Sequence, residues 1–206
     1  MFHVRAGSDQ RLSTNTTDTI RMMQHLNLKY AGRSVFVWGH ENMLPAMLKD
    51  VQTNAAAVHA VLPDLILEAG IFEIVTKAGV EGLRIPPAVF RAFDLPYVNR
   101  TFNYNAMLFP TGRFVDQWGK DSSVPDLTQA ESQMWFFYAA SSYIIQGVEA
   151  LHCGQIMLMS SSDVNNGMVQ TFSLFAKIRH FAAAHASLHV SLFIFFLRAF
   201  PHAPSL

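Results

Sequence analysis

Cysteine is almost absent from the sequence, since Cys153 is the only one among 206 residues. A single thiol excludes an internal disulfide framework and a cysteine-rich zinc site. Charged residues are also scarce, at 15% of the chain where about a quarter is usual. So low a charged fraction predicts either much buried surface or a partner that covers part of the surface.

No charge of one sign dominates, because 15 Lys and Arg residues balance 15 Asp and Glu residues. Binding to a nucleic-acid backbone needs a basic cluster, and none stands out, so we expect no nucleic-acid partner. Nine histidines leave a site of histidine and carboxylate ligands open. No H-x-H or H-E-x-x-H pattern supports one, and we therefore expect no metal and no cofactor.

A long hydrophobic run is missing too. The most apolar stretch, residues 188–200, is 13 residues long and contains His189 and Arg198. A membrane-spanning helix needs roughly 20 apolar residues, so no membrane span is expected. The first residues do not combine a basic segment with an apolar run, so no signal peptide is predicted, and a cytoplasmic location is the default expectation.

Three signature motifs are absent: the G-x-S-x-G elbow, the Walker loop and the dinucleotide-binding glycine fingerprint. Their absence disfavours α/β-hydrolases, nucleoside triphosphatases and Rossmann dehydrogenases. The chemistry of this chain must therefore be sought in the positions of single residues.

What the sequence does contain is an alternation of short apolar runs and helical patterns. The runs predict five strands, at residues 2–6, 34–38, 65–67, 150–153 and from 188 onward. The helical patterns cover residues 16–28, 42–62, 128–145 and 165–182, and Thr128 with Glu131 fits a capping box at the start of the third. Helical connections between apolar strands predict a parallel sheet covered by helices.

One region, residues 71–127, breaks this pattern. Six of the nine prolines lie between Pro63 and Pro125, and no long periodic segment appears. We predict a single α/β domain over residues 1–206, with residues 71–127 as a long irregular insertion after the third strand. The aromatic residues of this insertion fit either a ligand-binding surface or a small core of its own.

Two architectures fit parallel strand–helix units. A (β/α) barrel has eight units and about 250 residues, whereas a doubly wound sheet has a glycine-rich turn after its first strand. That turn is missing, so we favour a partial or truncated barrel of the TIM type. Its last strand would form an open edge, which favours self-association through that strand.

Ligands of both architectures bind at the carboxyl ends of the strands. That rule selects six residues: Arg5, His40, Glu41, Glu68, His152 and Gln155. If their strands are neighbours, Glu41 and Glu68 would lie roughly 5 Å apart, as the two carboxylates of a retaining glycosidase do. Glu73 is an alternative to either residue as a catalytic carboxylate. For Glu41, the alternative without a catalytic role is a position in the first turn of a helix, where a negative charge is favourable.

Further residues are candidates for binding a sugar. Trp38 and Trp118 would supply aromatic surfaces, beside Arg5, His40, His152 and Gln155. The alternative for either tryptophan or histidine is ordinary packing, and Cys153 is expected to be buried.

The segments Val37–Glu41, Leu67–Glu73 and Leu151–Gln155 resemble strand ends of glycoside-hydrolase-type (β/α) barrels. The resemblance is one of layout, over residues 33–185. It implies a carbohydrate ligand and hydrolysis of a glycosidic bond by paired carboxylates, with Glu41, Glu68 or Glu73 in those roles. The later strands of such barrels are absent from this chain.

Two alternatives to a glycosidase stay open. One is a non-catalytic barrel fragment that binds carbohydrate or protein, and the other is a barrel lyase or isomerase with a His/Glu site.

Overall fold

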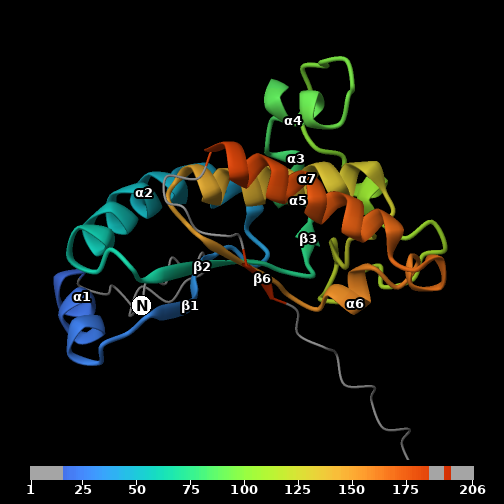
Figure 1. The fold of residues 1–206 in the computed structure, drawn as a ribbon. Helices are drawn as coiled ribbons and strands as arrows, with labels where there is room; N and C mark the ends of the chain where they lie inside the picture. Colours follow the sequence, from blue (N-terminus) through green and yellow to red (C-terminus); the bar gives the residue numbers. More distant parts are fainter. Residues whose placement is uncertain (1–15, 186–192, 196–206) are drawn as a thin grey trace, which may run out of the picture.

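The computed structural model describes residues 16–185 and 193–195, which form a mixed α/β fold (Figure 1). Four parallel strands make the main sheet, in the order β1 (Tyr30–Phe36), β2 (Ile66–Ile71), β5 (Ala150–Cys153) and β6 (Phe193–Phe195). Parallel pairing was predicted and is confirmed. The predicted strand at residues 2–6 lies outside the described residues.

The order of the four strands across the main sheet is the same as their order along the chain. A doubly wound sheet would instead reverse its strand order partway. Among the described residues the four strands do not close, so the structure shows an open, partial α/β arrangement and no complete barrel.

One face of the sheet is covered by the helices α2 (Leu44–Val61), α5 (Ala130–Ile145) and α7 (Val169–His185) (Figure 1). Alternate strand residues, such as Val35, Ala69, Ile71, Leu151 and Cys153, belong to the buried cluster that these helices complete. α5 is buried on most sides, which is why its residues are apolar almost throughout. The other helix of the amino-terminal part, α1 (Thr16–His25), packs on α2. No helix of the described part is long and apolar enough to cross a membrane.

β1 begins four residues earlier than predicted. It starts at Tyr30, and its register with β2 shifts between Ala31 and Val35, so the strand contains a bulge. Within the bulge Arg33 has φ of 47°. Gly32, directly before Arg33, lies at this irregularity inside the strand.

β2 also differs from its prediction. The ladder continues past Leu67 to Ile71, because Ala69 and Gly70 pair with β1 on one side and β5 on the other. Glu68 therefore lies within the strand and not beyond its end. That position is a correction to the predicted site.

The insertion at residues 71–127 contains several short helices and strands that the sequence did not predict. It contains β3 (Val75–Thr76) paired with β4 (Ser122–Ser123), the helices α3 (Lys77–Glu81) and α4 (Pro87–Ala92), and the 3-10 helix η3 (Tyr104–Met107). Elements this short show no readable hydrophobic period. Its aromatic residues, among them Phe102 and Phe109, join the main core and form no separate one.

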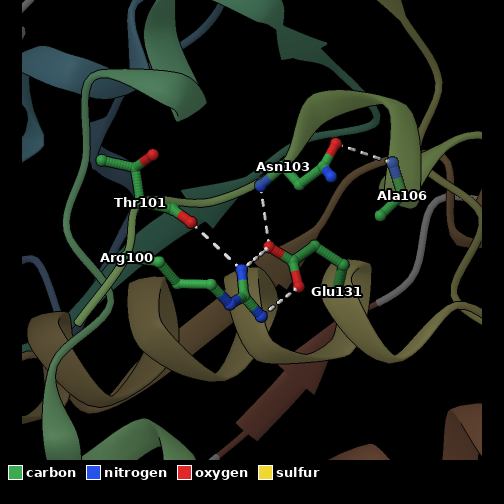
Figure 2. Close-up of polar contacts among 5 residues, drawn as sticks. All are labelled: Arg100, Thr101, Asn103, Ala106 and Glu131. Carbon is green, nitrogen blue, oxygen red and sulfur yellow. Dashed lines mark hydrogen bonds and ion pairs between the residues drawn. The ribbon is translucent and has the colours of Figure 1, made fainter. Parts of the chain in front are cut away.

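An ion pair joins the insertion to α5 (Figure 2). The Arg100 guanidinium donates from Nη1 and Nη2 to the two carboxylate oxygens of Glu131, at 2.6 and 2.8 Å. The Asn103 N–H donates to the same carboxylate at 2.7 Å. The predicted capping box is therefore wrong: Glu131 faces the insertion, and the Thr128 hydroxyl donates to Asp126 at 2.9 Å.

α7 begins later than predicted. The short helices α6 (Ile156–Met159) and η4 (Val164–Asn166) precede it. The buried Asp163 carboxylate accepts hydrogen bonds from the Thr171 N–H and hydroxyl, at 2.9 and 3.0 Å. A side chain eight positions upstream in the chain thus caps α7.

Candidate functional site

Four segments meet at the carboxyl end of the sheet. They follow β1 (residues 37–43), β2 (residues 72–76) and β5 (residues 154–155), and the fourth is the turn that holds Trp118. The sequence predicted that polar residues would gather at this edge. The contacts below show which of the predicted residues do so.

Glu73 joins the segments after β2 and β5. Its carboxylate accepts the Gln155 backbone N–H at 3.0 Å and the Gln155 side-chain amide at 3.1 Å. A Cβ on Gly154 would lie 2.3 Å from Glu73 Oε2, so only glycine leaves room for this carboxylate. Glu73 is buried, whereas Gln155 is partly exposed. The pair fixes two loops and leaves one amide at the surface.

Trp38 and Trp118 lie together at the same edge. Their ring centroids are 6.1 Å apart with the planes tilted by 60°. Trp118 Nε1 donates to the Glu73 carbonyl oxygen at 3.1 Å, which orients that ring. Trp38 is 47% exposed, which is high for the largest apolar side chain. Two of the predicted sugar-binding residues, 80 positions apart in the chain, are thus brought into one pair.

Glu41 lies in the 3-10 helix η2 (Glu41–Met43) after β1, and it is buried. Its carboxylate accepts the Thr76 N–H at 3.2 Å and the Thr76 hydroxyl at 2.5 Å. Gly79 makes space for it, since a Cβ there would lie 1.9 Å from Glu41 Oε2. Burial raises the pKa of the Glu41 carboxyl, while the bonds from Thr76 act in the opposite direction.

Glu68 is held inside the sheet. Its carboxylate accepts the Tyr30 hydroxyl at 2.5 Å and the Arg33 N–H at 2.7 Å. The second bond satisfies the backbone of the β1 bulge, so Glu68 stabilises that irregularity. Burial, together with the bond to Glu68, raises the pKa of the Tyr30 hydroxyl.

All six oxygens of these three carboxylates accept a hydrogen bond from this chain. The partners differ: Thr76 for Glu41, Tyr30 and Arg33 for Glu68, and Gln155 for Glu73. The structure thus gives each carboxylate a separate place in the fold, and their catalytic pairing stays a prediction.

His152 lies on β5 at the register position of Gly70, on the same face of the sheet as Glu68. The side chain is buried, its ring lies 5.7 Å from that of Phe72, and within the described residues no group pairs with its Nε2 atom. Burial lowers the pKa of His152, while the nearby Glu68 and Glu73 carboxylates act in the opposite direction. Burial therefore favours the neutral form of His152.

The remaining predicted residues contribute less. His40 is exposed beside Glu41, and Arg5 lies outside the described residues. Cys153 is buried, as expected, and burial raises the pKa of its thiol to about 12. Within residues 16–185, no three His, Cys, Asp or Glu side chains lie close enough together to hold a metal ion.

One polar cluster was missed, at the opposite end of the sheet. Glu149 Oε2 accepts the Leu67 N–H at 2.9 Å, and its other oxygen lies 3.1 Å from His59 Nε2. That nitrogen also lies 3.1 Å from the Leu65 carbonyl oxygen, to which it donates. The pairing with Glu149 raises the pKa of His59. The feature of the sequence that could have indicated this cluster is Glu149, a carboxylate directly before the apolar run of β5.

Comparisons with known proteins add little to this geometry. No protein-family model matches the sequence, and no curated protein matches it. Among solved structures, a Bacillus halodurans C-125 protein provisionally assigned as an alpha-N-acetylgalactosaminidase matches with 13% identity and a TM-score of 0.43. The match covers 88% of this chain and 43% of that protein, so this chain spans less than half of its length. At this identity and TM-score the likeness is a weak similarity of fold and says nothing about activity.

Proposed function

We propose that this chain binds carbohydrate at the carboxyl end of its sheet. The observation that carries the proposal is the Trp38–Trp118 pair, with one ring well exposed, next to the amide of Gln155. Sugar rings present apolar C–H faces and hydroxyl edges. An exposed indole with an amide nearby offers a partner to both kinds of surface.

The arrangement of the sheet supports this placement. Consecutive parallel strands joined by helices are the arrangement of (β/α) barrels, whose ligands bind at this edge. The proposal includes that the chain is a partial barrel with its binding edge retained. Glu41 and Glu73 then serve as the supports that fix the loops under the binding surface.

Hydrolysis of a glycosidic bond is the second candidate function. It is favoured by the shared face of Glu68 and His152, where a buried carboxylate lies with a histidine whose neutral form is favoured by burial and whose Nε2 is unpaired among the described residues. Glu68 would be one member of the carboxylate pair, and Glu41 or Glu73 the other. This function requires the second carboxylate to face the same bound sugar.

Trp38→Ala tests the binding proposal. Affinity for a glycan identified on an array should fall about two- to tenfold, because stacking on an aromatic ring contributes about 0.5–1.5 kcal/mol. Leu26→Ala is the matched control, since Leu26 is 60% exposed and lies between α1 and the amino end of β1. Equal affinity in the parent and in Trp38→Ala, measured by calorimetry, would refute the proposed site.

Glu68→Gln separates binding from hydrolysis. The glutamine oxygen can still accept the Arg33 N–H, and its amide can donate to the Tyr30 oxygen, so the fold should survive. If the chain is a hydrolase, product release from a panel of glycans should vanish while glycan binding persists. A parent protein that binds glycans and cleaves none of them would leave the binding function alone.

A further inference from the structure

A second concave surface lies among the helices α4, α5 and α7. This groove has a volume of about 450 Å³, within the range of sites for small organic ligands. Ala92 at the end of α4 and Phe137 of α5 line it, together with seven residues of α7 between Ser173 and His185. Alanine and serine side chains on α7 leave the groove its space.

Three rings of the groove lining, those of Phe137, Phe181 and His185, belong to a row of aromatic rings that continues to Phe93 beside the lining residue Ala92. The Phe93 and Phe137 ring centroids lie 5.9 Å apart, and those of Phe137 and Phe181 lie 5.5 Å apart. The His185 ring stacks on Phe181 at 4.1 Å, with an angle of 9° between the planes. His185 Nδ1 is fixed as a donor by the Phe181 carbonyl oxygen, 2.9 Å away. Such a row suits an apolar chain or ring of a ligand.

The charged side chains of the groove lining, of α7 and of α4 are all basic. None of the lining residues is acidic. The 17 residues of α7 include Lys177, Arg179 and two histidines but no Asp or Glu, and α4 contributes Arg91 and no carboxylate. In a protein whose total charge is zero, this is a local excess of positive charge.

Lys177 is placed to bind an anion at one side of the aromatic row. Its Nζ donates to the Ala92 carbonyl oxygen at 3.0 Å and lies 5.3 Å from the centroid of the Phe93 ring. Neither of these two neighbours carries a negative charge. Among the described residues, no carboxylate forms an ion pair with this ammonium group. An ammonium has three hydrogens, so two remain for a ligand.

We propose that this groove binds a small amphipathic anion: an apolar chain with one carboxylate, placed on the Phe137 and Phe181 rings with its head at Lys177. The apolar part loses contact with water on the rings, and the carboxylate supplies the negative charge that the groove lacks. This site is independent of the carbohydrate site, because its residues belong to α4, α5 and α7 and not to the strand ends.

The test uses cis-parinaric acid, a polyene fatty acid that fluoresces in apolar surroundings, and its uncharged methyl ester. The parent protein should bind the acid several times more tightly than the ester. Lys177→Met keeps an apolar side chain and removes the charge, so it should weaken binding of the acid about tenfold, as expected for one charged hydrogen bond. The affinity for the ester should stay the same.

Two further variants complete the design. Ala176→Phe fills the groove and should weaken binding of both probes, while thermal unfolding shows that the variant is folded. Arg179→Met is the matched control, because Arg179 lies on α7 outside the groove lining. Three results would each overturn the proposal: equal affinity for acid and ester, an equal effect of Arg179→Met and Lys177→Met, or no binding of the acid.

Discussion

Two glutamates tie β2 to β5, one at each end of the sheet. At the amino end, Glu149 accepts the Leu67 N–H at 2.9 Å, and at the carboxyl end Glu73 accepts the Gln155 N–H at 3.0 Å. Both carboxylates are buried. The two ends differ in what surrounds the bond: His59 and main-chain atoms at one end, and an exposed tryptophan and amide at the other.

This difference teaches that a buried glutamate at a strand end is not by itself a sign of chemistry. The same bond supports the fold at both ends. At the carboxyl end the bond lies beside an exposed tryptophan and a partly exposed amide. Each prediction below would break or sharpen this comparison.

Replacing the two glutamates should have unequal effects on stability. Glu149→Ala leaves the buried Leu67 N–H without its acceptor and removes the ion pair of His59, so we expect a loss of about 3 kcal/mol. Glu73→Ala should cost about 1 kcal/mol, because water can replace the carboxylate at the partly exposed Gln155. Urea unfolding measures both. An equal loss in the two variants would contradict the proposed difference between the two ends.

Gly154→Ala should destabilise the carboxyl end by about 2 kcal/mol, as overpacking commonly does. The new Cβ would lie 2.3 Å from Glu73 Oε2 and 3.1 Å from the Phe72 Cα, so backbone must move. Gly32→Ala is the control, since its Cβ would lie 3.5 Å from Glu68 Oε2, an ordinary contact. The midpoints of thermal unfolding of the two variants measure this difference. A midpoint as high for Gly154→Ala as for Gly32→Ala would show that Gly154 is not required for space.

The amino end should also respond to pH. The pKa of His59 is raised in the folded protein by Glu149, so protonated His59 stabilises the fold below its ordinary pKa of about 6.5. This contribution should be lost as pH rises from about 6.5 through the folded-state pKa, and we expect it to be below about 1 kcal/mol. His59→Gln should flatten that part of the profile of unfolding free energy against pH. If the slope of that profile is the same in His59→Gln as in the parent protein, the pH dependence belongs to another group.

The sequence predicted β5 with its observed bounds, because Ala150–Cys153 is a short apolar run between two turn signals. It also predicted the parallel pairing and the helices around the sheet. It placed Glu68 beyond a strand end, since Ala69 and Gly70 resemble a turn more than a ladder. Pairing with strands on both sides decides such positions, and a single sequence does not contain that information.

The candidate site was predicted residue by residue and not as a set of contacts. Trp38, Trp118, Glu73 and Gln155 were each selected, but their contacts join segments far apart in the chain. Likewise, Glu131 matched a local capping pattern, but in the structure its carboxylate pairs with the distant guanidinium of Arg100. A local sequence pattern does not predict the partner of a buried charged group when a stronger partner lies elsewhere in the fold.

The ion pair between Arg100 and Glu131 has a consequence for protein engineering. Arg100 belongs to the insertion at residues 71–127, but Glu131 belongs to α5, so the insertion does not carry its own anchor (Figure 2). Transplanted alone onto another scaffold, it would bring a guanidinium and the Asn103 N–H without their common acceptor. A donor fragment extended through the first turn of α5 would transfer both halves of the attachment.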